Sequence, residues 1–400
     1  MSEEILVTIA GAGVVGCATA YELSKVINGN IVIVERNNSV KGENQSSRNS
    51  GVIHAGIFYP RDFGPLKSSL CVKGNSLLYE FCEKNNVPYK KCGKLVVATS
   101  PMEEEYLEDV LRIAKENGVE GISTLDRNQI NKIEPNINAV SAIHAPSSGI
   151  VESTGLVEAL YNRAEENGAI FITSNELTDI NPCAREGFNI GIRSVNGNEQ
   201  FKTKIFINSA GLYSDEIAKK INPELNYIMD PVKGESAKFS SLRRKNIRLS
   251  GMSIYPVPFG YLPDGERLNV PFKQFLELFK QHKVTKSVGV HISPTFDSDS
   301  IFTVGPAYSI PESRQDYKPS RKESYYLDKV LQFLPGLKQE DISLHQVGIR
   351  AKLKDRYDYV IERDESFSGC INLVGIDSPG LTSSLAIAKY VRKMVLEILQ

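Results

Sequence analysis

The chain has 400 residues and a nearly balanced charge, with 47 Lys and Arg against 48 Asp and Glu. Hydrophobic residues make up 41% and charged residues 24%, which is typical of a globular protein long enough for more than one hydrophobic core. Because the net charge is −1, no overall field attracts a polyanion, so nucleic acid is not an expected partner.

Targeting, membrane and metal signals are weak throughout the sequence. The N-terminus runs directly into a short apolar stretch, and no stretch approaches the about 20 apolar residues of a membrane-spanning helix. The 6 cysteines are scattered without a CxxC pair, which favours free thiols and argues against a metal site. These features predict a cytoplasmic protein.

A β-α-β unit is predicted at the start of the chain. Residues 5–10 and 31–34 are apolar runs of strand length, and residues 14–26 between them have helical spacing. A GxGxxG pattern at 11–16 joins the first strand to the helix. In that context the pattern predicts a dinucleotide site.

Each residue of this turn has an expected task. Gly11 permits the tight turn, Gly13 lets the backbone approach a pyrophosphate, and Gly16 allows the helix to lie close to the strand. The N–H groups of the helix start, at Val14 and Val15, favour the phosphate charge. Where the second strand ends, we expect Glu35 to accept hydrogen bonds from the adenosine ribose, with Arg36 beside it.

The remaining elements follow in chain order. Helices are expected at 66–83, 102–115, 153–167 (with Ser153 or Thr154 as the cap and Gly168 at its end), and 211–220; strands at 94–98, 188–192, 201–205, across 230–311, and at 371–374, before a long closing helix. The strands at 188–192 and 201–205 alternate as in a half-buried antiparallel sheet. The chain is therefore expected to leave a nucleotide domain, build an antiparallel domain, and return.

Two further polar, glycine-containing segments separate the cofactor alternatives. The loop at 45–57 and the strand-to-helix turn at 208–215 lie far from the first glycine turn, and together they suit a long cofactor, FAD, better than NAD. The residues expected to bind FAD are Gly11, Gly13, Val14, Val15, Gly16, Glu35, Arg36, Ser46, Ser47, Asn49, Ser50, Gly51, Ile53, Ala210, Gly211, Ser214, Arg350, Ser378, Pro379, Gly380, Leu381 and Thr382.

Segments spread over nearly the whole chain carry a family resemblance. They are 49–60 (NSGVIHAGIFYP), 66–74 (LKSSLCVKG), 209–215 (SAGLYSD), 254–258 (IYPVP), 288–291 (VGVH), 304–306 (VGP), 347–352 (VGIRAK) and 374–382 (VGIDSPGLT). In this order they resemble the D-amino-acid oxidase and glycerol-3-phosphate dehydrogenase superfamily of flavoproteins. Within it, they are most similar to L-2-hydroxyglutarate dehydrogenases and oxidases.

The resemblance implies an α/β plus antiparallel-β fold: a Rossmann-type FAD-binding domain interleaved with an antiparallel β-sheet substrate domain. We expect residues 1–85, 145–225 and 340–400 in the former, and 86–144 and 226–339 in the latter. It also implies oxidation of a small 2-hydroxy acid, L-2-hydroxyglutarate first, with oxygen, a quinone or an electron-transfer protein as electron acceptor. Oxidation of glycerol 3-phosphate or an amino acid on the same scaffold is the alternative.

The expected chemistry needs a carboxylate anchor, a base and a positive group near the flavin pyrimidine. Arg350 is the expected anchor because its planar fork binds a carboxylate bidentately, although a structural ion pair would also explain it. Tyr255 and Lys233 are secondary candidates. The helix start at 378–382 can aim its N–H groups at the flavin O2, unless Ser378 or Thr382 merely caps it.

Two of the 5 histidines lie in the family-like segments. His291 is the expected base, with a purely structural role as the alternative. His54 stands near the end of the loop at 45–57, which we call the flavin loop, and related flavoproteins attach FAD to a histidine in a similar setting, so a covalent link is a hypothesis. His144, His282 and His345 are expected to be ordinary surface or core residues.

One departure from the family pattern is an insertion at 259–287. Within 271–283, an aromatic stripe formed by Phe272, Phe275, Leu276 and Phe279 is flanked by lysines, as in a helix lying on a membrane surface. Such a helix would place the protein at the inner face of a membrane. The alternative is that the stripe packs on the substrate domain or on a partner subunit.

Overall fold

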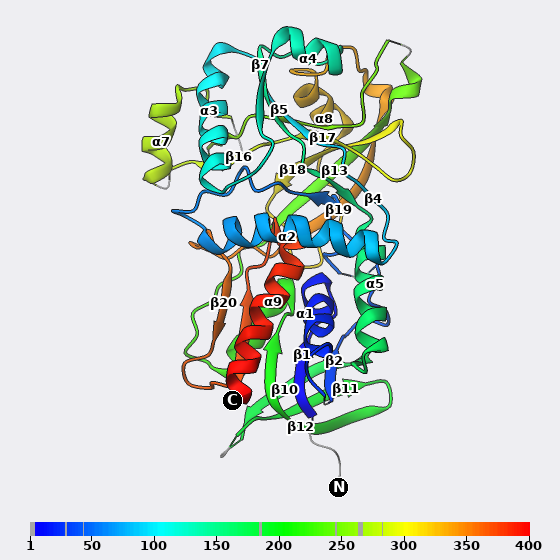
Figure 1. Cartoon of the computed structure of the whole chain (residues 1–400), viewed down its shortest axis with the longest axis vertical. Coiled ribbons are helices and arrows are strands. Elements are labelled where there is room, and N and C mark those ends of the chain that lie inside the picture. Colours follow the sequence, from blue (N-terminus) through cyan, green and yellow to red (C-terminus); the bar gives the residue numbers. More distant parts are fainter. Residues whose placement is uncertain are drawn as a thin grey trace.

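The computed structural model describes residues 5–28, 30–42, 44–183, 186–244, 246–262, 267–281 and 283–400. Two lobes, each built on a large sheet, lie one above the other, and helix α2 crosses between them (Figure 1). The expected class is confirmed: parallel and antiparallel sheets are combined with helices in an interleaved chain. None of the helices in the described part of the chain is long and apolar enough to cross a membrane.

The sheet of the lower lobe has eight strands in the order β10-β11-β12-β1-β2-β9, with β21 beside β12 and β20 beside β21. The strands β1, β2, β9, β12 and β21 run parallel where they pair, which brings their carboxyl ends to one edge. Its strands are β1 (Ile5–Ala10), β2 (Ile31–Val34), β9 (Ile170–Ile172), β10 (Glu176–Pro182), β11 (Phe188–Ser194), β12 (Gly197–Asn208), β20 (Val360–Arg363) and β21 (Cys370–Val374).

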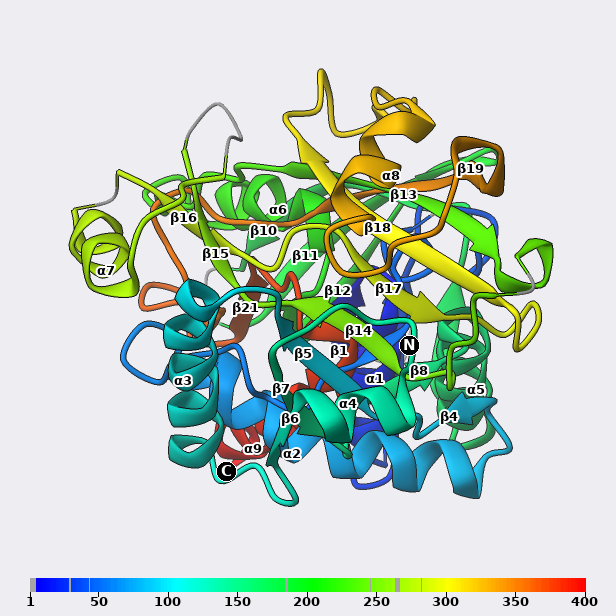
Figure 2. The same cartoon turned by 90° about the horizontal axis from the view of Figure 1, so that it is seen from above.

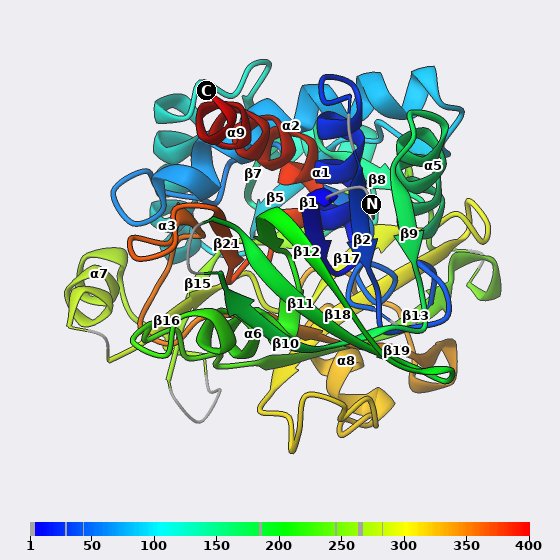
Figure 3. The ribbon, with the colours of Figure 1, turned by 90° about the horizontal axis from the view of Figure 1, so that it is seen from below.

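Both faces of this lower sheet are covered. Helices α1, α5 and α9 lie on one face and α6 on the other (Figure 3). The first face is apolar: Ile9 and Ile33 of the parallel strands are fully buried in one cluster with Leu23 of α1 and Val391 of α9. On the second face, Ile180 and other side chains of the antiparallel strands join those of β1 and β2 in a separate cluster.

The upper sheet also has eight strands, in the order β19-β13-β18-β17-β14-β5-β7-β6. Figure 2 shows it from above. Its strands are β5 (Lys94–Ala98), β6 (Ser123–Asp126), β7 (Ser141–Ala145), β13 (Val232–Ser240), β14 (Ser253–Pro256), β17 (His291–Pro294), β18 (Ile301–Ser309) and β19 (Ile342–Arg350). All neighbours are antiparallel except β5 and β14, which pair in parallel.

The remaining elements are a small third sheet and the helices. A three-stranded sheet joins β3 (Val52–Ile53), β8 (Gly149–Val151) and β4 (Tyr89–Lys90). The helices are α1 (Val14–Ser24), α2 (Pro65–Lys84), α3 (Pro101–Glu116), α4 (Arg127–Ile133), α5 (Ser153–Glu166), α6 (Ser214–Ile221), α7 (Phe272–Lys280), α8 (Glu323–Val330) and α9 (Gly380–Leu399), with short 3-10 turns at Gly211–Tyr213, Ser241–Arg243 and Gln339–Asp341.

Two local expectations need correction. The cap of α5 is Glu152, not Ser153 or Thr154, because its carboxylate accepts the N–H groups of Thr154 and Gly155. The expected return to the FAD-binding domain at residue 340 is too early. Strand β19 pairs with β13 in the upper sheet, and the chain returns to the lower lobe only after Arg350. Both errors concern side-chain choice and strand partners, which the hydrophobic pattern does not encode.

The insertion forms a small hairpin of β15 (Phe259–Tyr261) and β16 (Thr285–Ser287) that carries α7 at the side of the upper lobe (Figure 2). Phe275 of α7 is only 1% exposed and lies against Tyr106 of α3, with ring centroids 5.4 Å apart. Phe272 contacts the same tyrosine edge-on at 5.1 Å. This face therefore has the contacts expected of a helix packed on the substrate domain.

Candidate active site

The glycine turn lies where β1 ends between its parallel neighbours, which is the place where α/β sheets bind ligands. Gly11 adopts φ +91°, a conformation that favours glycine. A Cβ on Gly16 would lie 1.9 Å from the Gly11 carbonyl oxygen. Helix α1 can thus start against the strand only if Gly16 has no side chain.

Side chains from other segments hold this turn in place. The Ser46 hydroxyl accepts the Val14 N–H at 2.9 Å, which joins the flavin loop to the start of α1. Glu35, at the end of β2, accepts the Ala12 N–H at 2.8 Å on one carboxylate oxygen and the Asn37 N–H at 2.9 Å on the other. Its carboxylate is therefore fixed beside the turn, and each oxygen keeps a lone pair that a ribose hydroxyl can use.

A continuous cavity of about 1700 Å³ extends from Glu35 and Arg36, past the glycine turn, to the opposite end of the lobe interface. Both sheets contribute to its wall. A carboxylate stands at one end of the cavity, glycine-lined backbone in the middle, and the start of α9 at the other end. This elongated arrangement fits an extended dinucleotide such as FAD. A Cβ on Gly13 would lie 3.2 Å from the Ser46 hydroxyl, a tight contact that only a small shift of that side chain would relieve.

Most of the residues expected to bind the cofactor do line this cavity: Gly11, Gly13, Val14, Val15, Glu35, Arg36, Ser46, Asn49, Ser50, Ala210, Gly211, Arg350, Ser378, Pro379, Gly380 and Leu381. Six do not, namely Gly16, Ser47, Gly51, Ile53, Ser214 and Thr382. Some of these residues hold the lining residues in place without touching the cavity. Ser214, for example, is fully buried and donates its hydroxyl to the Gly211 carbonyl at 2.7 Å.

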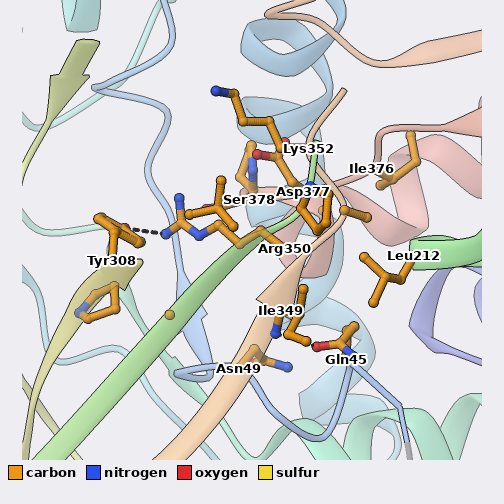
Figure 4. A pocket seen from close by; sticks show the side chains of 18 of the residues that line it. Gln45, Asn49, Leu212, Tyr308, Ile349, Arg350, Lys352, Ile376, Asp377 and Ser378 are labelled. Atoms are coloured by element: carbon orange, nitrogen blue, oxygen red, sulfur yellow. Dashed lines mark hydrogen bonds between the residues drawn. The ribbon is translucent and has the colours of Figure 1, made fainter. Parts of the chain in front are cut away.

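Arg350 projects from the end of β19 into the cavity, and Tyr308 of β18 points toward it (Figure 4). The Arg350 guanidinium donates to the Tyr308 hydroxyl at 2.5 Å and stacks over its ring. Burial lowers the pKa of Arg350, but the neighbouring Tyr308 and Asp377 oxygens outweigh it and leave the pKa raised. Arg350 is thus a charged group whose hydrogen-bond partner is a neutral phenol.

His54 lies at the same end of the cavity, between Tyr59 and Ser378. Its Nδ1 is 3.4 Å from the Tyr59 hydroxyl and its Nε2 3.4 Å from the Ser378 hydroxyl. Burial, Lys94, His291 and Arg350 hold the pKa of His54 well below its usual range, so the ring is neutral. Covalent attachment of FAD to His54 stays a prediction, which yellow colour retained by acid-precipitated protein would support.

His291 and Tyr255 form the facing wall from β17 and β14. Their rings stack with centroids 3.7 Å apart, and His291 Nδ1 is 3.1 Å from the Gly289 carbonyl, which leaves Nε2 as the second ring nitrogen. Burial, with Lys94 adding to it, lowers the pKa of His291 to about 3. All four expected catalytic residues, His291, Arg350, His54 and Tyr255, therefore line one end of the cavity.

The start of α9 borders this end of the cavity. The helix begins at Gly380, and neither Ser378 nor Thr382 caps it with a side-chain hydrogen bond. Thr382 instead accepts the backbone N–H of His54 at 3.0 Å, which ties the flavin loop to α9. The Gly380 N–H already donates to the Asp377 carbonyl at 2.6 Å, so the next two N–H groups, of Leu381 and Thr382, are the ones available to a group in the cavity.

Lys233 does not reach the cavity. It is buried beside Asp316, with Nζ 2.8 Å from a carboxylate oxygen, and its role is a structural ion pair. His144 and His345 do not line the cavity, and their ordinary surface or core roles stay predictions; His282 lies outside the described residues.

The sequence did not point to four residues at the end of the cavity that holds Arg350, His54 and His291, which we call the flavin end. Tyr59 and Lys67 stood inside the resemblance segments, but their side chains had no distinguishing pattern. Tyr308 lies two residues beyond another such segment, at a position of β18 that faces the cavity. Lys94 begins the strand expected at 94–98, and a lysine inside a buried strand is itself a signal of an unusual environment.

The two-sheet fold and this cavity define a flavin-type oxidoreductase, and comparisons with known proteins agree. The sequence model of the FAD-dependent oxidoreductase (DAO) family matches residues 7–394. The chain belongs to this family; it is an enzyme, and its cofactor is FAD.

Individual relatives cover most of the chain. It is 30% identical over 423 residues to the mitochondrial L-2-hydroxyglutarate dehydrogenase of Caenorhabditis elegans, covering 96% of this chain and 91% of that one. It is also 30% identical to the glycerol 3-phosphate dehydrogenase of Caloramator mitchellensis, covering 96% and 72%. The structure of the FAD-bound L-alpha-glycerophosphate oxidase of Mycoplasma pneumoniae matches with a TM-score of 0.83 at 24% identity, covering 98% and 95%.

The contact at Gly16 makes a first prediction. We expect Gly16→Ala to lower the free energy of unfolding by about 1–3 kcal/mol and to yield protein with less bound FAD, because the added Cβ meets backbone that cannot move without shifting the turn. Thermal melting and the flavin-to-protein absorbance ratio measure both effects. Val26→Ala, at an exposed position just past α1, is the control. Wild-type flavin content in Gly16→Ala would contradict the role of this contact.

Proposed function

We propose that the protein oxidises a short 2-hydroxy acid, L-2-hydroxyglutarate first, to the corresponding 2-oxo acid. The observation that supports this most is the juxtaposition of a charged Arg350 with two neutral imidazoles, His54 and His291, at one end of the FAD cavity. Several relatives that match nearly the whole chain are named L-2-hydroxyglutarate dehydrogenase. When bound, FAD supplies the acceptor for the substrate's hydride.

Arg350 has the chemistry to orient the substrate. Its planar guanidinium can grip a carboxylate bidentately, and Tyr308, already hydrogen-bonded to it, fixes the direction of the fork. Tyr255 borders the same space and keeps its proton, since burial raises its pKa well above the usual range. A substrate carboxylate held at Arg350 would place its hydroxyl carbon between the two histidines and the start of α9.

A neutral imidazole is suited to take the hydroxyl proton. We infer that His291 does so, because Gly289 engages Nδ1 and fixes the tautomer with an acceptor at Nε2. His54, held by two hydroxyl groups, then orients the substrate beside the flavin. The N–H groups of Leu381 and Thr382, in the first turn of α9, favour negative charge that develops on this side of the cavity.

The electron acceptor and cellular location are separate proposals. Oxygen, a quinone or an electron-transfer protein each suits a flavin enzyme, and we infer a cytoplasmic location from the sequence. Contact of residues 271–283 with the inner face of a membrane stays a prediction. The buried Phe275 and its contacts with Tyr106 favour the packing alternative for α7.

The substrate proposal predicts a specific spectral change. Under anaerobic conditions, L-2-hydroxyglutarate should bleach the oxidised flavin, while D-2-hydroxyglutarate, lactate, malate, glycerol 3-phosphate and amino acids should bleach it more slowly or not at all. The rate constant of flavin reduction for each compound measures this directly. Bleaching by glycerol 3-phosphate alone would assign the protein to the activity named for its Caloramator relative instead.

The histidine pair makes a second prediction for the reductive step. At saturating substrate, His291→Asn should slow flavin reduction by about 10²–10⁴-fold, as expected for loss of a general base, and His54→Asn should slow it less. Because the pKa of His291 is lowered to about 3, its base form persists as pH falls, so the wild-type rate should stay level from pH 8 down to 5. A rate that halves near pH 6.5, or a larger loss in His54→Asn, would assign the base elsewhere.

A further inference from the structure

Lys94 stands at the start of β5 with its side chain inside the protein. It is 1% exposed, and its ammonium lies 3.8 Å from the ring centroid of Tyr255 and 5.4 Å from that of Phe58. The His291 ring also stacks on Tyr255, with centroids 3.7 Å apart. Lys94 therefore lies behind the wall that His291 and Tyr255 present to the substrate. It does not itself line the cavity.

This lysine has no anionic partner in the described part of the chain. The titratable groups that face it are two thiols, Cys71 of α2 and Cys92 before β5, together with His54, His291 and Tyr255. Burial raises the pKa of both thiols, and burial lowers that of both imidazoles, so all of these groups are neutral near pH 7. Burial also lowers the pKa of Lys94 itself, to about 7.

The flavin end of the cavity thus holds more positive than negative charge. Asp377 is neutralised by Lys67, whose Nζ lies 2.6 Å from its carboxylate. Arg350 remains, as does Lys94 in its protonated form, and neither makes an ion pair with a carboxylate among the described residues. A buried cation without a counter-ion destabilises the fold, so a ligand that supplies the missing charge would bind with a gain in free energy.

We propose that Lys94 is a specificity-determining residue: its ammonium, acting through the wall formed by Tyr255 and His291, makes the cavity favour substrates with two negative charges over those with one. The inference rests on the proposed function and narrows it to dicarboxylates. Arg350 holds the carboxylate next to the reacting carbon, and Lys94 attracts the second carboxylate without touching it. In a protein interior an attraction between two unit charges several ångströms apart is worth about a factor of ten or more in affinity.

A consequence is that binding of a dianion is coupled to protonation of Lys94. A dianion near Lys94 stabilises the ammonium, so binding favours the protonated form. In the free enzyme that form is lost as pH rises through about 7. Affinity for a dianion should therefore fall as pH rises from 6.5 to 8.5, whereas affinity for a monoanion that reaches only Arg350 should change little.

The test compares glutarate with pentanoate, which have the same chain length but two and one carboxylates. Each is titrated into the FAD-loaded enzyme, and the perturbation of the flavin absorbance gives Kd. In Lys94→Met the Kd of glutarate should rise by at least about tenfold and that of pentanoate by less than about twofold. Lys91→Met, which removes an exposed lysine three residues away, should change neither value.

Equal weakening of both acids in Lys94→Met would overturn the proposal and leave Lys94 with a packing role. If Lys94→Met does not retain FAD, the wild-type pH series decides: a glutarate-to-pentanoate affinity ratio that stays flat from pH 6.5 to 8.5 overturns it. A wild-type enzyme that binds neither acid overturns it as well. The two proposals can fail separately. If selectivity for glutarate depends on Lys94 but L-2-hydroxyglutarate does not bleach the flavin, only the proposed function is overturned.

Discussion

The close approach of helix α1 to strand β1 is the constraint on which the rest of the structure depends. Gly16 has no room for a Cβ beside the Gly11 carbonyl, and only this approach brings the start of α1 to the strand edge. Ser46 and Glu35 then bind the backbone of the same turn from two other segments. The adenosine end, the turn and the flavin loop are therefore positioned together.

From that edge, the cavity reaches the second lobe through β19. This strand pairs with β13 in the upper sheet, yet its last residue, Arg350, points into the space beside the start of α9. The flavin loop is attached to it, because Gln45 accepts the Ile349 N–H at 2.7 Å and Gln346 donates to the Asn49 carbonyl at 2.8 Å. The carboxylate anchor and the flavin loop consequently hold a fixed relation, which supports a reaction that needs precise alignment.

The sequence predicted the elements whose signals are local. The first β-α-β unit, the closing helix and the antiparallel hairpin each follow from apolar period and glycine position, and the structure confirms them. Interactions between distant segments could not be predicted in this way. Tyr308 and Lys94 acquire their roles only when β18 and β5 meet Arg350 and Tyr255, and Glu152 becomes a cap only through its contact with the next turn.

Positive side chains without a paired carboxylate explain why this cavity would select an acid. Arg350 is the most important of them. The most direct test is kcat/KM for L-2-hydroxyglutarate in Arg350→Lys, with FAD content measured on the same samples. We expect a loss of at least about 100-fold with FAD retained, because an ammonium keeps the charge but loses the bidentate fork. A kcat/KM within about threefold of wild type would contradict the account.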